Sequence, residues 1–146
     1  MLRAAALPAA FLALLTAAVS AATPPGLTAT DAWIRATPGV DVAAAYLTLH
    51  NAGTQPVVVS GVRSPAAAAA MIHETTLVNG ESSMRPHEPL RIAAGETVRF
   101  APGGLHIMLH GLKRPLAVGD EVPVTLLIEG GGSVTALARV RPLGDG

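Results

Sequence analysis

Hydrophobic and polar residues alternate along most of this chain, in short runs that are separated by turn residues. Runs with a two-residue period that are rich in Val, Ile, Leu and Thr predict strands, and no long window has a convincing helical period. Many short strands with Gly and Pro between them are typical of an all-β sandwich or barrel. Strands are therefore expected at 27–36, 43–51, 56–63, 90–92, 97–101, 105–112, 121–128 and 133–141, with a hairpin between the third and fourth of these.

The hairpin is predicted from one segment and one dipeptide in the middle of the chain. Ala66 to Ala70 is a run of helix-forming residues, but it is only about one helical turn long and follows Pro65. We interpret it as the lead into a strand that begins near Met71. Asn79-Gly80 then predicts a tight turn, because both central residues of a type I′ turn need a positive φ.

The turn also predicts which residues of the hairpin face one another. If Val78 pairs with Glu81, then Thr75 pairs with Met84, and His73 lies on the face of Thr75, diagonal to Met84. Diagonal neighbours on antiparallel strands are about 7–8 Å apart, which is within reach of long side chains. An imidazole and a thioether could therefore share one ion, whereas a slip of one residue would separate them.

A second pair of candidate ligands lies on the strand expected at 105–112. Residues i and i+2 of a strand face the same side, so His106 and Met108 point one way and the apolar residues beside them point the other. The turn Pro102-Gly103-Gly104 places this pair near a strand end. Exposed ligands at such a rim would suit an ion that is handed on to another protein.

These four residues have the spacing H-x10-M-x21-H-x-M, and their chemistry favours Cu(I). Thioether sulfur is soft and selects Cu(I), while imidazole binds copper and zinc alike. Zinc sites more commonly use Cys, His and carboxylates. The chain contains no cysteine, so neither a thiolate electron-transfer copper centre nor a disulfide framework is available. The sequence predicts one Cu(I) ion held by His73, Met84, His106 and Met108.

With its flanking residues, this quartet resembles the periplasmic copper chaperones of the PCu(A)C family. The resemblance is carried by four stretches, which are residues 31–38, 44–51, 73–76 and 104–109. It covers nearly all of the chain after residue 26. It implies a single-domain, cupredoxin-like Greek-key β-sandwich or barrel that carries Cu(I) outside the cytoplasm. It also implies delivery to a copper-accepting protein, such as the copper subunit of cytochrome c oxidase or another copper chaperone.

Two further histidines are candidate auxiliary ligands. His110 stands two residues after Met108, where methionine-richer relatives would present another thioether, and His87 lies close to the hairpin. Imidazole favours Cu(II) more than a thioether does, so these residues would make the site more tolerant of Cu(II). Both could equally be surface histidines, which is the expectation for His50.

Three other large side chains are assigned to packing. Met71 falls on the face of His73, but methionine is a common core filler, so it is left out of the predicted site. Trp33 and Tyr46 are expected in core or edge packing.

The first 22 residues are expected to be a secretory signal peptide that is cleaved after Ala21 or Ala22. A short basic start with Arg3 precedes an almost wholly apolar stretch, and small residues follow it. An uncleaved membrane anchor is the alternative, but the stretch is short and Ala-rich and contains Pro8, which makes it poorly suited to span a bilayer.

A linker at 23–26 and one domain at 27–146 are expected to follow, in the periplasm. About 125 residues can bury a core without disulfides. Without Arg3, nine basic residues remain against ten acidic ones. A nearly neutral domain gives no reason to expect nucleic acid or an anionic membrane surface as a partner.

The sequence contains none of the common catalytic motifs. The sequence has no G-x-S-x-G elbow, no H-E-x-x-H, no Walker glycine loop and no dinucleotide fingerprint. A copper carrier that is not an enzyme is therefore the preferred interpretation. The alternatives are a copper storage or resistance protein, a copper-dependent redox protein with an open position at the ion, and a β-sandwich interaction module that binds no metal.

Overall fold

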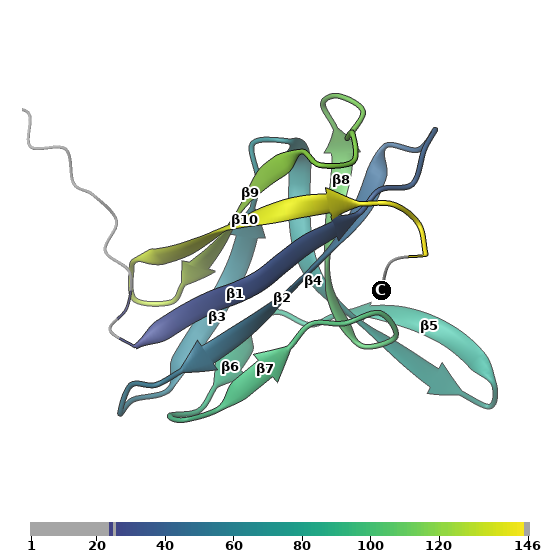
Figure 1. Cartoon of the computed structure of the whole chain (residues 1–146). Helices are drawn as coiled ribbons and strands as arrows, with labels where there is room; N and C mark the ends of the chain where they lie inside the picture. Colours follow the sequence, from purple (N-terminus) through teal and green to yellow (C-terminus); the bar gives the residue numbers. More distant parts are fainter. Residues whose placement is uncertain (1–23, 25, 145–146) are drawn as a thin grey trace, which may run out of the picture.

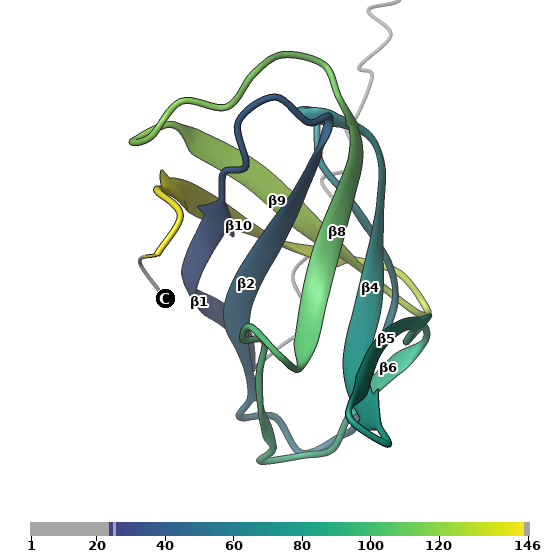
Figure 2. The same ribbon diagram turned by 90° about the vertical axis from the view of Figure 1, so that its right-hand side faces the viewer.

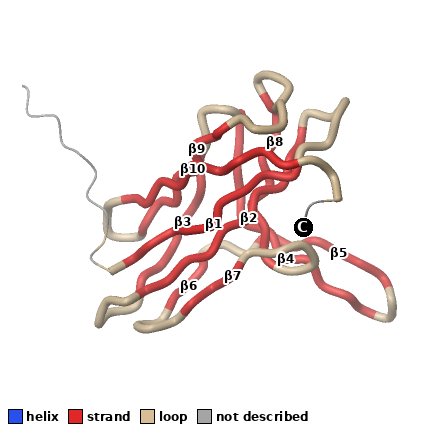
Figure 3. Tube along the Cα trace, in the orientation of Figure 1, coloured by secondary structure: helices blue, strands red, loops and turns tan. Residues whose placement is uncertain are grey.

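The computed structural model describes residues 24 and 26–144, and the predicted signal peptide lies outside them. Every regular element in this part of the chain is a strand, as Figure 3 shows. No helix long and apolar enough to cross a membrane occurs among these residues. The strands are β1 (Leu27–Arg35), β2 (Val42–Asn51), β3 (Val57–Arg63), β4 (Ala67–Val78), β5 (Glu81–Pro86), β6 (Leu90–Ile92), β7 (Thr97–Arg99), β8 (Leu105–Leu112), β9 (Glu121–Ile128) and β10 (Ser133–Arg141).

Most of the strands close into a barrel. Around it they follow the order β4-β8-β2-β1-β10-β9-β3, and the pairing of Val62 with Ala70 joins β3 back to β4. β1 and β10 run parallel, and the other neighbours are antiparallel. The short strands β5, β6 and β7 extend β4, β3 and β2 (Figures 1 and 2). The all-β Greek-key barrel predicted from the sequence is confirmed.

The core of the barrel is formed by the side chains of every second residue along the strands, which point inward. On β8, Ile107 and Leu109 are fully buried, and Ile72 of β4 lies opposite Ile107 with no exposed surface. The same alternation runs through β10, where Val134, Ala136, Ala138 and Val140 are buried between exposed neighbours. Because side chains alternate across a strand, the other half of each strand forms the outer face of the barrel.

The alanine run is part of a strand, so the predicted start near Met71 was too late. β4 begins at Ala67, which pairs with Leu112 of β8. Helix propensity differs by only fractions of a kcal/mol per residue, and sheet pairing outweighs it over so short a run. Small side chains also suit this part of β4, because Ala68 lies close to Gly111 of β8. A Cβ added at Gly111 (φ +62°) would lie 2.9 Å from the Ala68 Cβ.

The hairpin has the turn and the register that the sequence predicts. Asn79 and Gly80 have φ values of 53° and 79°, as a type I′ turn requires. Val78 pairs with Glu81, and Thr75 pairs with Met84. β5 is an edge strand, and Figure 1 shows this hairpin extending away from the barrel.

Candidate metal centre

His73 and His106 lie directly opposite each other on neighbouring strands of the barrel. They are register partners in the β4–β8 pair, and the centroids of their rings are 5.9 Å apart. With metal–nitrogen bonds of about 2 Å, two imidazoles that share one ion keep their ring centroids about 4.5–6 Å apart. The structure therefore brings together the two histidines that the sequence selected, at a spacing that one ion could bridge.

The orientation of His106 is fixed by a backbone carbonyl. Its Nδ1 lies 3.0 Å from the carbonyl oxygen of Gly104 and donates to it, since a carbonyl can only accept. Nε2 must then carry the free lone pair of the neutral ring, as in metal-bound histidines whose other nitrogen donates to a carbonyl. The same carbonyl also accepts the N–H of Thr75 at 3.1 Å, which ties the turn before β8 to β4.

Both histidines have a buried nitrogen that makes no hydrogen bond to any of the described residues. These atoms are Nε2 of His106 and Nδ1 of His73. Leaving such an atom unpaired costs about 1–3 kcal/mol, so a buried nitrogen without a partner on each ring indicates a ligand-binding role. His106 is only 4% exposed, and the prediction that the rim ligands are exposed was wrong for this residue.

The surroundings of His73 favour its neutral form, which is the form that binds metal. Burial lowers the pKa of His73 most, and the charges of His106 and His110 lower it further. Glu88 acts in the opposite direction; its Oε1 accepts the N–H of Ile72 at 2.7 Å. A depressed pKa reduces competition between protons and a metal ion near neutral pH.

The two predicted methionines lie on the same face as the histidines. Met108 is half-buried and follows His106 by two positions on β8, while Met84 is 59% exposed and pairs with Thr75. Met84 is thus a diagonal neighbour of His73, at the spacing that long side chains can bridge. The proposed coordination of an ion by these two thioethers stays a prediction.

Met71 was assigned to packing from the sequence and left out of the predicted site. It is half-buried on the outer face, rather than in the core, and it is the register partner of Met108. Its two-residue spacing from His73 puts both side chains on one face of β4, as predicted, and its place opposite Met108 makes it a further candidate thioether.

The two auxiliary candidates differ in position. The ring centroid of His110 is 6.2 Å from that of His73, so His110 borders the histidine pair. His87 instead has its Nδ1 3.1 Å from Oε2 of Glu74, a residue that faces away from His73 by strand alternation. No three His, Cys, Asp or Glu side chains form a ready-made metal site among the described residues. The thioethers of Met84, Met108 and Met71 are further donors on the face of the histidine pair.

Two adjacent rows of side chains cross the outer face from the candidate site. In one row Arg35, Ala44, Met108 and Met71 are successive register partners on β1, β2, β8 and β4. In the next row Trp33 pairs with Tyr46, and their ring centroids are 4.5 Å apart. Both aromatic residues are buried, as predicted, but on the outer side of the barrel wall.

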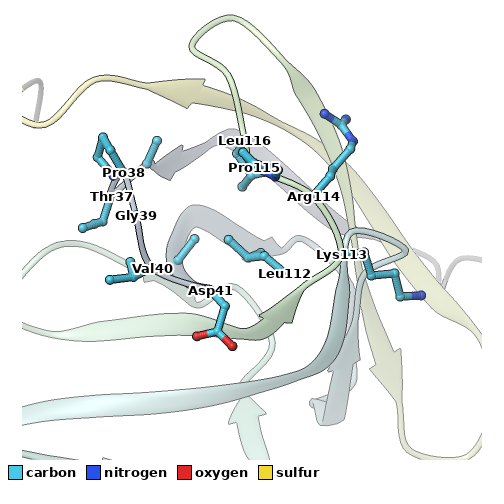
Figure 4. Close-up of a pocket in the computed structure, with 12 residues that line it drawn as sticks. Thr37, Pro38, Gly39, Val40, Asp41, Leu112, Lys113, Arg114, Pro115 and Leu116 are labelled. Atoms are coloured by element: carbon cyan, nitrogen blue, oxygen red, sulfur yellow. The ribbon is translucent and has the colours of Figure 1, made fainter.

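A cavity of about 290 Å³ lies at the far end of β8 from His106. The loop 37–41 and residues 112–116 line it, and in Figure 4 Lys113 and Arg114 extend away from that loop. No histidine or methionine lines this cavity, so it lacks the donors of the candidate metal centre.

The fold is shared with solved structures of copper proteins. A domain described as "Copper-bound PCuAC domain from PmoF2" superimposes with a TM-score of 0.67 at 23% identity, over 84% of this chain and 98% of that one. The structure described as CuI-DR1885 from Deinococcus radiodurans has a TM-score of 0.65 and 35% identity, over 82% of this chain and 80% of that one. At 23% identity, the similarity to the PmoF2 domain shows only that the fold is shared.

The sequence comparisons identify the family. A curated relative named "Putative lipoprotein Lxx21020", from Leifsonia xyli subsp. xyli, is 39% identical over 117 residues, which are 80% of this chain and 70% of the relative. The model of a family described as "Putative lipoprotein LpqE-like" matches residues 27–140. That match runs from the first residue of β1 to the last but one of β10, and the chain belongs to the LpqE-like family.

Proposed function

We propose that this protein is a copper chaperone of the PCu(A)C type that binds one Cu(I) ion through His73, Met84, His106 and Met108. The observation that carries the proposal is the facing histidine pair, in which each ring has a buried nitrogen without a hydrogen-bond partner in the described part of the chain. Thioethers on the same face supply soft donors, and soft donors select Cu(I). The 35% identity to a protein whose structure was solved with Cu(I) supports the choice of metal.

Ligand exchange is the mechanism that these residues allow. The histidine pair is held by the closed barrel, and the Gly104 carbonyl orients His106. Met84 is exposed on an edge strand. An incoming donor can reach the ion there, so Met84 is the first ligand to be replaced. None of the four ligands carries a charge when metal is bound, so the thiolates of an acceptor would bind Cu(I) more strongly and set the direction of transfer.

The proposed place of action is the periplasm, with an acceptor such as the copper subunit of cytochrome c oxidase or another copper chaperone. The signal-like first 22 residues and the lipoprotein names of the family and the curated relative support export. The acceptor is proposed from the resemblance to PCu(A)C proteins.

The test is a Cu(I) titration of the purified protein against a chromophoric chelator, with native mass spectrometry to count the ions bound. We expect one Cu(I) per chain, and loss of at least 100-fold in affinity in His73→Ala and His106→Ala. His50→Ala is the matched control. The Nδ1 of His50 is hydrogen-bonded to the Thr97 hydroxyl at 2.8 Å, at the end of β2 that lies away from the site. Wild-type affinity in both site variants would refute the proposed site.

A further inference from the structure

Arginine side chains cover the aromatic pair on the outer face beside the candidate metal centre. The guanidinium carbon of Arg141 lies 5.0 Å from the centroid of the Trp33 ring. That of Arg35 lies 5.7 Å from the centroids of both Trp33 and Tyr46. We call Trp33, Tyr46, Arg35 and Arg141 the arginine–aromatic patch.

The patch holds positive charge that the described part of the chain does not neutralise. The only ion pairs within 4 Å among the described residues join Arg114 to Asp120 and His87 to Glu74. Arg35 and Arg141 are register partners on the parallel strands β1 and β10, and their guanidinium carbons lie 5.7 Å and 5.0 Å from the centroid of the Trp33 ring. Like charges so placed repel each other unless an anion lies between them or near them.

The patch also has hydrogen-bond donors without acceptors. Nε of Arg35 is buried and has no partner among the described residues. A guanidinium that stacks on a ring keeps its N–H groups in its own plane, where they can bind a carboxylate through two parallel bonds. Arg141 is exposed, so its guanidinium group is accessible to such an acceptor, and Arg35 lies half-buried beside it.

The register places this patch close to the copper ligands and on the same face. Arg35 pairs with Ala44, and Ala44 pairs with Met108, so only one methyl side chain separates the guanidinium row from the thioether row. Two strand spacings of about 4.8 Å each put the backbones of Arg35 and Met108 about 10 Å apart. A protein that approaches the ion from outside the barrel would meet the patch in the same encounter.

A carboxylate lies near the neighbouring arginine, Arg139. Glu121 is its register partner on β9, although the two make no ion pair within 4 Å. Arg139 is also the partner of Trp33 on the β1 side. Arg139 thus has a carboxylate on the neighbouring strand, whereas the register partners of Arg35 are Ala44 and Arg141.

We propose that the arginine–aromatic patch docks an acidic surface on the copper acceptor protein and so places the acceptor's ligands over the His73–His106 pair. This inference rests on the proposed function, because it assigns a docking surface to the same copper transfer. Complementary charge raises encounter rates by 10-fold to 1,000-fold and loses this effect at high ionic strength. The partner is therefore a protein with Asp or Glu side chains about 10–14 Å from its copper-accepting thiols.

The test uses the full chain loaded with Cu(I) and three synthetic acceptor peptides. Each peptide has the same pair of cysteines, flanked by glutamates, serines or lysines. At low salt we expect transfer to the glutamate peptide to be about tenfold faster than to the lysine peptide, and we expect the difference to vanish at 0.5 M salt. Equal rates for the three peptides would overturn the proposal.

Variants at Arg141 assign the effect to the patch. Arg141 is exposed, so Arg141→Glu should fold, and it should reverse or remove the preference for glutamate, while Arg141→Lys should keep most of it. Arg91→Glu is the matched control, since Arg91 is exposed on β6, away from the patch. The same loss in the Arg91 and Arg141 variants would overturn the assignment to the patch.

Two measurements separate this proposal from others. Cu(I) affinity should be unchanged in the Arg141 variants. If the wild-type protein binds no Cu(I), the proposed function itself fails. If it binds Cu(I) normally but transfers it equally to all three peptides, only the docking surface is refuted. Sedimentation with phosphatidylglycerol vesicles tests a lipid as the anion. Binding to vesicles that depends on Arg141, without any peptide preference, would overturn an acidic protein partner in favour of a membrane surface.

Discussion

Replacing His106 by leucine should stabilise the metal-free protein and abolish tight copper binding. His106 is 4% exposed, and its Nε2 has no hydrogen-bond partner among residues 24 and 26–144. Removing this unpaired atom relieves about 1–3 kcal/mol, while the lost hydrogen bond from Nδ1 to Gly104 costs about 0.5–1.5 kcal/mol. Leucine has a similar volume and adds apolar burial, so we expect a net gain of about 1 kcal/mol.

Urea or thermal unfolding with a copper chelator present measures this gain. For a domain of this size, 1 kcal/mol corresponds to a rise in Tm of about 4 °C. Loss of an outer-sphere partner of a metal ligand alone costs 10-fold to 100-fold in affinity, so loss of His106 itself should cost at least 100-fold. Copper should therefore raise the Tm of the wild-type protein and leave that of the variant unchanged.

The result that refutes this reasoning is a metal-free variant that is less stable than the wild type by 1 kcal/mol or more. Nε2 would then be satisfied in solution, and the unpaired nitrogen would not indicate a ligand-binding role. His50→Leu is the control for a histidine outside the site, because its Nδ1 has a partner in Thr97. It should gain no stability and should keep wild-type copper affinity.

Four other changes probe the rest of the site. Met84→Leu should lower Cu(I) affinity at least tenfold and alter the free energy of unfolding by less than about 0.5 kcal/mol, because the side chain is 59% exposed; undiminished affinity in chelator competition would exclude it as a ligand. Met71→Leu should lower affinity more in a Met84→Leu background than alone if Met71 can substitute as the thioether, and equal effects in the two backgrounds would contradict this. The pKa of His73 is lowered, mainly by burial, so as the pH falls the imidazole is protonated in the unfolded chain before it is protonated in the folded one. Metal-free stability and Cu(I) affinity should therefore both fall only as the pH drops below the ordinary value of about 6.5. A loss that begins above pH 7 would disagree. His110→Met should weaken Cu(II) and change its electron paramagnetic resonance spectrum, since it removes an imidazole near His73; identical spectra would show that His110 is a bystander.

Much of the fold could be predicted because its local signals agree with its packing. Asn79-Gly80 determines the hairpin turn, and the turn determines the register that pairs Thr75 with Met84. The alternation around Ile107 separates core from outer face on β8. The start of β4 was misplaced because Ala67 to Ala70 have helical propensity, and only their pairing with distant residues makes them a strand.

The arrangement across strands could not be predicted from the sequence. Nothing local shows that His73 lies opposite His106 instead of merely near it, since β4 and β8 are joined by a long excursion through three short strands. The same limitation hid the partnership of Met71 with Met108 and the row that leads from there to Arg35. Non-local register depends on the closure of the whole barrel, which no short motif encodes.

The two sides of the candidate site differ in how firmly the fold holds them, and this difference suggests an order of copper release. β4 and β8 are each paired on both sides within the closed barrel, so the histidine pair is fixed. β5 pairs only with β4, and all six of its residues are exposed, so separating it from β4 disrupts little of the core. If Met84 binds the ion as proposed, it can therefore leave without disturbing His73 or His106. An acceptor thiolate that takes the place of Met84 would form the first mixed complex, and the buried nitrogen of His106 would be the last donor to release the metal.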